Sequence, residues 1–448
     1  MQRWENISIV FVVVGMISLL LTAGMPRPCS AVVTEEQMKN WPVPCYQGEE
    51  LQKVREWEKT WVGKKINQDN IDQVKEFLSD QFYEVFKNPQ DWGATELFFT
   101  IAPYQQALFT PGQIEATRKY APTAKLDPNP RKAYWKGEVL PNEFLVGWDK
   151  AEGAGIPFPF PQSGVEIAWN MESSNQYGDT RSVHRDGVVV NPRTKAERRA
   201  VQPWMHDYFT RRCDFPPMPN KPDNPKGIRR AMFLEIVEPL DVKDTRYMEL
   251  RYLDVTKPED VWIWFPLFRR IRRMGVVYKS DTIDGTDLGP DDEMGWNGHV
   301  NVKNWNIVGR KEMLVGRHED TTKYTKEKGQ AVYSGFQLER TNTYVVECKW
   351  KNPDASYSKE VTYMDPEIWR ALQKVVWDRQ GRVWRQFFYN RETVKTKDPN
   401  VVVSHCFNLY SMDLQRRHGS PVLDKIKEIG QNIDNSFWTI QNLQKLGF

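Results

Sequence analysis

An apolar strand pattern that leads into a cluster of arginines has the clearest chemical potential in this sequence. Residues 261–268 read Val-Trp-Ile-Trp-Phe-Pro-Leu-Phe, and four arginines follow directly: Arg269, Arg270, Arg272 and Arg273. Apolar walls beside guanidinium groups suit an amphiphile, because its tail leaves water while its anionic head accepts bidentate hydrogen bonds. The pattern therefore predicts a binding groove for a molecule of this kind.

The side chains of this segment would alternate between two faces if it continued as one strand. One face would carry Trp262 and Trp264 with Arg270 and Arg272, and the other would carry Ile263 and Phe265 with Arg269 and Arg273. Alternation does not decide which face lines a hollow. The alternative to a groove is a buried strand whose arginines form ion pairs with Glu166, Asp291 or Asp292.

The predicted ligand site combines this segment with aromatic residues elsewhere in the chain. The candidate lining residues are Trp169, Trp262, Trp264, Phe265, Phe268 and Trp305. The candidate groups for an anionic head or for ion pairs are Arg269, Arg270, Arg272 and Arg273, and Glu166 is the carboxylate assigned to the site.

The sequence has no familiar catalytic signature. Its six histidines never stand at a spacing typical of metal ligands, and GxSxG, Walker, GxGxxG and CxxCH motifs are missing. We therefore expect no catalytic residue, no cofactor and no metal centre. One acidic loop leaves two interpretations open, a Ca²⁺ site with oxygen ligands or a solvated loop that pairs with nearby arginines. Its residues are Asp281, Asp284, Asp287, Asp291 and Asp292.

Composition limits the class of protein. The 448 residues include 62 Lys and Arg against 59 Asp and Glu, and 40% of them are hydrophobic. Such a chain can bury a large core, and its net charge of +3 is too small for a general electrostatic grip on nucleic acid. A disordered chain and a polytopic membrane protein are therefore excluded, and no nucleic-acid partner is expected.

The first 31 residues have the pattern of a secretory signal peptide. An apolar run from Ile9 to Met25 precedes the small residues at 29–31, although a retained inner-membrane anchor is the alternative. We expect the protein in the periplasm of a Gram-negative bacterium. Four cysteines would then lie in an oxidising space, where at least one disulfide is expected: Cys45, Cys213, Cys348 and Cys406.

Hydrophobic periodicity predicts an α+β fold that is mainly β. Residues 48–92 read as two amphipathic helices, and residues 97–164 read as an extended arm rich in turn signals. Eight or more strands are expected, which favours one large antiparallel sheet. They span residues 165–171, 231–237, 246–253, 261–268, 302–308, 344–350, 359–364 and 383–389.

Two further local patterns complete the expected organisation. Asp378 to Gly381 reads as a hairpin turn, and the residues from Ser420 read as an amphipathic helix with Ser420 as N-cap and Pro421 at the first helical position. The expected regions are a signal peptide (1–31), an N-terminal helical extension (32–96), an arm (97–164), a sheet domain (165–415) and a C-terminal amphipathic helix (416–448).

Several motifs in a fixed order resemble a known family. They are Gly155–Pro161 with Gly164, Glu166, Trp169 and Asn170; Phe265-Pro266 with Arg269–Arg273; Asp291-Asp292 with Asn297-Gly298, Trp305 and Gly309–Met313; and Tyr363, Asp365, Trp369 and Asp378–Gly381 with Trp384-Arg385. Between Leu97 and Tyr389 the chain resembles an exported bacterial family of unknown function, grouped with the LolA/LolB-like outer-membrane lipoprotein-sorting carriers.

This resemblance implies a strongly curved, half-open antiparallel sheet wrapped around helices, with a hollow for a lipid or another hydrophobic molecule. It implies a periplasmic carrier or chaperone and not an enzyme. The implied partners are an inner-membrane RND-type exporter of the MMPL kind and an outer-membrane protein. Two alternatives stay open: a non-catalytic adaptor between exporter and outer-membrane partner, and an enzyme that acts on a hydrophobic substrate.

The chain departs from the family pattern at three places. Leu267 replaces a glycine, Met274-Gly275 follows the arginine cluster in place of Ala-Pro, and Val315-Gly316-Arg317 ends the Gly309 motif differently. These changes put a ligand shared with the family in doubt. The two helices expected over 48–92 lie outside the common pattern.

Overall fold

The computed structural model describes residues 33–127, 133–135, 138–140, 144–146, 155–175, 178–254, 257–275, 282–283 and 285–445. The predicted signal peptide lies outside these residues, as do Asp281 and Asp284 of the acidic loop. Fifteen of the described strands form one sheet, which is built mainly from two antiparallel meanders.

The first meander runs from β7 to β12. Its strands are β7 (Thr180–Asn191), β8 (Ala196–Tyr208), β9 (Ile228–Glu235), β10 (Arg246–Tyr252), β11 (Asp260–Phe265) and β12 (Arg270–Met274). The second meander consists of β13 (Lys303–Val315), β14 (Phe336–Trp350), β15 (Lys359–Met364), β16 (Ala371–Trp377), β17 (Val383–Lys395), β18 (Val402–Asp413) and β19 (His418–Ile429). Antiparallel pairing of β19 with β7 joins the two meanders.

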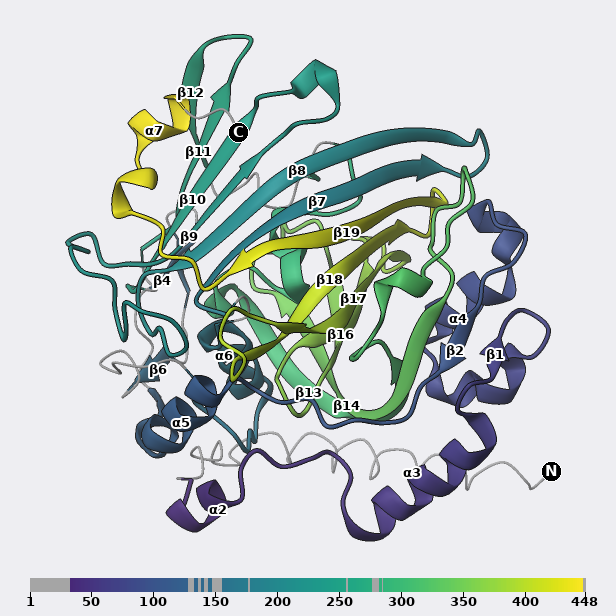
Figure 1. Ribbon diagram of the computed structural model, residues 1–448. Helices are drawn as coiled ribbons and strands as arrows, with labels where there is room; N and C mark the ends of the chain where they lie inside the picture. Colours follow the sequence, from purple (N-terminus) through teal and green to yellow (C-terminus); the bar gives the residue numbers. More distant parts are fainter. Residues whose placement is uncertain are drawn as a thin grey trace, which may run out of the picture. The chain divides into compact units, whose positions relative to one another are not determined.

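The sheet is open between two strands that follow each other in the chain. Among the described residues β12 pairs only with β11, while β13 pairs only with β14. The small strands β1 (Lys65–Ile66) and β2 (Phe99–Ile101) extend the other side of β14, where β2 forms the one parallel pair of the described sheet. Figure 1 shows the curvature of the sheet. The predicted mainly β fold with a large half-open sheet is confirmed, with this parallel pair as its mixed part.

One face of the sheet is concave. The segment after β12 contacts strands of both meanders on this face, because Glu293 binds Arg185 of β7 and Asp292 binds Lys374 of β16. A short segment can reach both meanders only if the sheet curves around it. We call the face that contacts residues 285–302 the inner face and the opposite one the outer face. Helix α6 (Gly164–Ser173) packs against β13 on the inner side.

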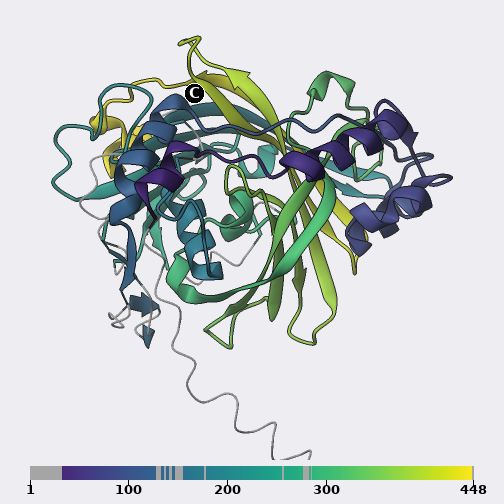
Figure 2. The ribbon, with the colours of Figure 1, turned by 90° about the horizontal axis from the view of Figure 1, so that it is seen from below.

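The two meanders have different covers on their outer face. Helix α3 (Gly48–Trp61), the 3-10 helix η1 (Ile71–Phe77) and α4 (Asp80–Lys87) belong to the N-terminal region. Residues of η1 and α4 share a buried cluster with Phe388 and Met412 of the second meander. The 3-10 helix η9 (Asn435–Phe437) and α7 (Ile440–Lys445) instead cover Phe233, Met248 and Trp264 of the first meander. Figure 2 shows the N-terminal helices from below.

The other described elements are short. They are α2 (Glu35–Lys39), α5 (Pro111–Tyr120), β3 (Lys125–Asp127), β4 (Ala133–Trp135), β5 (Glu138–Leu140), β6 (Phe144–Val146), η2 (Pro89–Trp92), η3 (Ala121–Thr123), η4 (Leu240–Val242), η6 (Pro290–Gly295), η7 (Val300–Val302) and η8 (Thr321–Lys323). The predicted arm therefore contains a helix, α5. None of the described helices combines the length and apolarity needed to cross a bilayer.

Two predicted elements have the wrong secondary structure. Residues 165–171 were expected as a strand but belong to α6, which begins with a capping box between Ser163 and Glu166 and is apolar on most sides because it is buried on most sides. The helix expected from Ser420 is strand β19, which bonds to β18 and β7 on its two sides. Pairing along both edges overrides the local helical pattern, since it satisfies the backbone of the whole segment.

Other elements agree with the sequence. Strand β15 has the predicted bounds, and β9 and β10 differ from them by a few residues at their ends. The predicted turn at Asp378 joins β16 to β17, and Gly381 supplies a positive φ of 76°. The second predicted helix is divided into η1 and α4.

The expected disulfide is not formed. The four cysteines concerned all lie within the described residues, and no bond joins any two of them. Cys348 lies on β14 and Cys406 on β18, with three strands between them. Because neighbouring strands are about 4.8 Å apart, that separation is far too large for a disulfide.

Candidate functional site

An apolar pocket lies on the inner face of the first meander. This pocket holds about 640 Å³ of space between protein atoms, including its open mouth. Its walls come from β8 to β12 on one side and from the 283–297 segment on the other. The lining residues are Trp204, Met232, Leu234, Tyr247, Glu249, Val261, Ile263, Met274, Gly275, Ile283, Pro290, Glu293 and Asn297.

A second pocket of about 370 Å³ adjoins the first. It is lined mainly by β7, β8 and β19, and it shares Trp204 and Ile283 with its neighbour. The Trp204 ring is held in place because the Arg185 guanidinium lies 4.1 Å from its centroid and its Nε1–H donates to Gln202 at 3.1 Å. The indole and Ile283 therefore form the partition between the two hollows.

The polar end of the larger pocket belongs to a buried network of charges. Arg230 donates to Asn297 and lies 3.4 Å from Glu249, while Arg251 lies 3.0 Å from Glu259 and 3.2 Å from Glu172. Burial alone would raise the pKa of Glu172, but the positive charges of Arg229 and Arg251 lower it. The pocket thus has an apolar wall and a charge-balanced floor.

The mouth of the pocket carries two of the predicted arginines. In the β11–β12 pair, Val261 lies opposite Met274, Ile263 opposite Arg272 and Phe265 opposite Arg270. Opposed residues in an antiparallel pair share a face, so Arg270 and Arg272 continue the inner face beyond the pocket wall. Both arginines are exposed, which leaves their guanidinium groups accessible.

The predicted distribution of side chains over the two faces is wrong. The 261–274 segment is a hairpin whose turn covers residues 266–269, so the chain reverses before the arginines. Trp262 and Trp264 therefore share the outer face with Arg273, which pairs with Asp260. Trp264 is buried in the cluster beneath η9 and α7, and Trp262 packs at its margin. Neither of these indoles lines the pocket.

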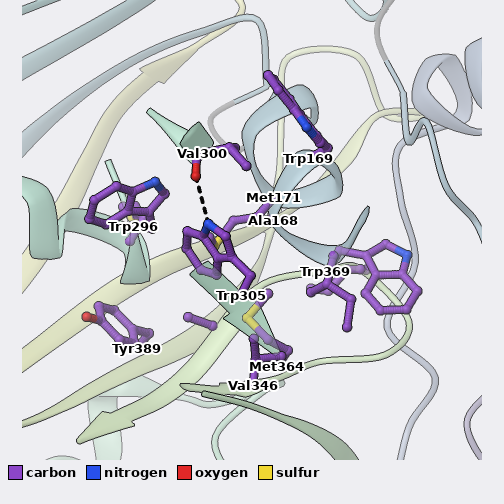
Figure 3. Packing of buried hydrophobic residues seen from close by; sticks show 14 of the residues in the cluster. Ala168, Trp169, Met171, Trp296, Val300, Trp305, Val346, Met364, Trp369 and Tyr389 are labelled. Carbon is purple, nitrogen blue, oxygen red and sulfur yellow. Dashed lines mark hydrogen bonds between the residues drawn. The ribbon is translucent and has the colours of Figure 1, made fainter. Parts of the chain in front are cut away.

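Trp169 and Trp305 belong to the main core and not to the pocket. Figure 3 shows them with Trp296 and Trp369 in one packed cluster. The Trp305 indole donates to the carbonyl of Val300 at 2.8 Å and contacts Trp296 edge to face. These roles are structural, so the structure does not gather the predicted lining residues at one site.

The tryptophans around Trp296 pack against a buried lysine, Lys303. The Lys303 ammonium lies 3.3 Å from the centroid of the Trp296 ring and 4.7 Å from that of Trp350. It also forms a 2.7 Å ion pair with Glu360. Burial lowers the pKa of Lys303, although Glu360 opposes the shift. The aromatic residues here surround a residue of the chain itself.

The remaining predicted polar residues have structural partners. Glu166 accepts the backbone N–H of Gln162 and Ser163 at the start of α6. Asp292 binds Lys374 and accepts from Tyr357 at 2.8 Å, and Asp287 lies 2.8 Å from His418 Nδ1. The described part of the acidic loop is therefore buried and paired, and its partners are not the arginines of the hairpin.

One group of potential metal ligands occurs among the described residues. Atoms of Asp179, Cys213 and Asp214 lie within 4.8 Å of one another. However, the Asp179 carboxylate accepts the backbone N–H groups of Cys213, Asp214 and Phe215. The group anchors the turn after β8.

Phe268 and Phe265 lie at the tip and base of the β11–β12 turn. Phe265 is half-buried, Phe268 is exposed, and their ring centroids are 6.5 Å apart. Sequence reasoning missed most of the true pocket wall, including Met232, Leu234 and Tyr247. The signal available was β9 itself, since a continuously apolar strand such as 231–234 has both faces covered.

A curved, half-open sheet with an apolar pocket on its inner face defines the structural class of this chain. The chain belongs to the family described as "Protein of unknown function (DUF1329)", whose model matches residues 65–444. The family predicted from the sequence motifs is thus confirmed. The match begins inside the two predicted N-terminal helices and continues beyond Tyr389, so it is wider than the motifs indicated.

One curated relative and several solved structures are similar to this chain. Uncharacterized protein PA3922 of Pseudomonas aeruginosa is 24% identical over 333 residues, which cover 71% of this chain and 67% of the relative. A DUF1329 family protein from Desulfovibrio piger has a TM-score of 0.45 and 14% identity, with 62% of this chain and 97% of that chain covered.

Two further solved structures have related descriptions. A putative outer membrane lipoprotein-sorting protein domain from Vibrio parahaemolyticus has a TM-score of 0.44 and 13% identity, with 63% of this chain and 98% of that chain covered. A LolA superfamily protein from Nitrosomonas europaea has a TM-score of 0.37 and 12% identity, with 59% of this chain and 91% of that chain covered.

Proposed function

We propose that this protein is a carrier that holds the apolar part of an amphiphile in the inner-face pocket. The observation that carries this proposal is the apolar wall of the inner-face pocket, which continues along the β11–β12 pair into the exposed Arg270 and Arg272. In this arrangement the tail of the ligand packs against Leu234, Val261 and Ile263. The two guanidinium groups bind its anionic head through charge-assisted hydrogen bonds.

The chemistry of the pocket supports this function. Sites for small molecules combine apolar walls with a few polar groups. The acidic groups of the floor, Glu249 and Glu293, have arginine partners within the chain. They therefore offer no uncompensated charge to a bound tail. Arg270 and Arg272 at the mouth, in contrast, have no acidic partner among the described residues.

We further propose that the carrier works in the periplasm with an inner-membrane RND-type exporter and an outer-membrane protein. This part rests on the signal-peptide pattern of the first 31 residues and on the family resemblance. An amphiphile that crosses an aqueous compartment needs its tail shielded from water, and a pocket closed on one side by the 283–297 segment supplies such shielding.

Native mass spectrometry of the chain, exported in a Gram-negative host, tests the carrier function. We expect a folded protein with a stoichiometric hydrophobic molecule, which organic extraction then recovers. A folded chain that carries no extractable molecule and does not bind a fluorescent fatty-acid analogue would refute the carrier function. The same spectra would show whether the first 31 residues are removed.

A further inference from the structure

We propose that the tip of the β11–β12 hairpin docks the protein on an anionic lipid bilayer by inserting Leu267 and Phe268 into the interface. This inference concerns the turn at residues 266–269, outside the pocket. It does not require a ligand in the pocket, and its test is separate from the test of carriage.

The apolar side chains of the tip are exposed in an unusual way. Leu267 is 86% exposed and Phe268 is 62% exposed. The other large hydrophobic residues that are exposed in the described chain stand singly in the sequence: Val62, Leu108, Met218, Leu240, Val308 and Ile440. Single exposed apolar residues are common on soluble surfaces, but an adjacent pair at a projecting turn presents a continuous apolar tip.

Positive charge surrounds this tip. Arg269, Arg270 and Arg272 are exposed and form no ion pair with a described residue, whereas Arg273 pairs with Asp260. Glu259, which directly precedes β11, binds Arg251. Within the described part of the chain, the tip therefore combines two apolar side chains with three guanidinium groups that have no acidic partner.

A bilayer surface matches this chemistry better than a protein partner. A stable protein interface buries about 800 Å² on each side, which is more than a four-residue turn can offer. A membrane interface requires no shape complementarity, and it accepts a few apolar side chains while arginines extend to the head groups. Each cation near an anionic surface strengthens binding roughly fivefold.

The position of the hairpin connects docking with the pocket. Strand β12 is an edge of the sheet, so the tip projects without a neighbouring strand beyond it. Phe265 and Arg270 form the last pair before the turn, and Ile263 and Arg272 the next on the same face. A docked tip would place the arginine mouth of the pocket at the lipid surface, where an amphiphile could enter or leave.

Cosedimentation with vesicles tests the proposal on the exported full chain. A double variant, Leu267→Ser with Phe268→Ser, should bind phosphatidylglycerol-containing vesicles at least about tenfold more weakly than the wild type. The matched control combines Leu108→Ser with Met218→Ser, two exposed apolar residues outside the loops at the hairpin end of the sheet. Equal loss in both double variants, or no loss in the hairpin variant, would overturn the proposal.

A second measurement locates the contact and tests the charges. Vesicles should slow hydrogen exchange in the peptide that contains the turn, a local readout that membrane binding by the N-terminal segment does not mimic. Arg269→Gln should weaken binding to anionic vesicles about fivefold and leave binding to phosphatidylcholine vesicles unchanged. Unchanged exchange at the turn, or equal effects on both vesicle types, would contradict docking on anionic lipid.

Discussion

Ile263 lies directly opposite Arg272 in the antiparallel pair of β11 and β12. Ile263 lines the pocket, whereas Arg272 is exposed at its mouth. One face of a single hairpin therefore joins the apolar wall to the cationic rim. The first two predictions separate the contributions of these two neighbours.

Filling the pocket should block the binding of the ligand tail. Ile263→Trp adds an indole to the apolar wall, so we expect the affinity for a fluorescent fatty-acid analogue to fall at least about tenfold. Val308→Trp makes a similar change at an exposed residue of β13 and should leave the affinity unchanged. A normal titration with the Ile263 variant would show that the probe binds elsewhere.

Removing the positive charges at the mouth of the pocket should weaken the binding only of ligands that have an anionic head. Arg270→Gln with Arg272→Gln should lower the affinity for an anionic amphiphile about tenfold and leave that for its neutral alcohol analogue unchanged. Because both residues are exposed, the free energy of unfolding should change by less than about 0.5 kcal/mol. Arg273→Gln, on the outer face, is the matched control for charge, and isothermal calorimetry with urea unfolding gives both quantities.

The buried ion pair of Arg185 should be essential for stability. Arg185 is buried between Asp424 at 2.7 Å and Glu293 at 2.9 Å. Arg185→Met leaves both carboxylates without this partner, so we expect a loss of about 3–5 kcal/mol in urea unfolding. Arg198 forms a comparable contact with Asp241 on the surface, and Arg198→Met should cost less than about 1 kcal/mol. Similar losses in both variants would contradict this difference in burial.

Glu319 should make the free energy of unfolding depend on pH between 4.5 and about 8. Burial raises its pKa from 4.5 to about 8, although hydrogen bonds from Tyr324 and Gln337 oppose the shift. The folded protein therefore holds a proton that the unfolded chain releases above pH 4.5. This contribution to stability is complete below pH 4.5 and is lost as pH rises to about 8, by up to about 1.4 kcal/mol per pH unit.

The variant Glu319→Gln isolates this effect. A neutral amide lacks the titration, so the stability of the variant relative to the wild type should increase between pH 5 and pH 8 and then level off. Urea unfolding at several pH values measures this difference, in which other titrating groups cancel. A difference that is constant over this range would mean that Glu319 is ionised in the folded protein.

Gly164 should be required for the contact between α6 and β13. A Cβ atom at this position would lie 2.5 Å from the backbone carbonyl of Trp305, which cannot move without disturbing the strand. We expect Gly164→Ala to cost about 1–3 kcal/mol in thermal or urea unfolding. Gly275→Ala meets no atom within 4 Å and is the control. Equal stability of the two variants would show that the helix can shift.

The hairpin explains why strand positions were predicted and faces were not. The apolar residues of β11 are evident in the sequence, but its turn lacks the glycine or asparagine that marks a reversal. Arg269 instead adopts the left-handed conformation, with a φ of 49°. Without a visible turn, strict alternation continues the strand past residue 265. It then places Trp262 and Trp264 on the face of Arg270 and Arg272.

Long-range packing accounts for the other differences. The pocket wall is assembled from five strands and a crossing segment, and no local pattern brings Met232 near Ile283. Trp169 and Trp305 have the composition of ligand-lining residues, but they pack around α6 and the 3-10 helix η7. Individual strands such as β15 were predictable because alternation and turn signals are local properties.

The pairing of β19 with β7 determines when the sheet can be completed. Asp424 lies opposite Arg185, 239 residues earlier in the chain. Until β19 has left the ribosome, the first meander has an unpaired edge at β7 and Arg185 lacks Asp424. Pairing over such a sequence distance makes folding slow. If the chain is exported as proposed, this late pairing would keep it able to pass through a translocation channel until nearly all of it has been made.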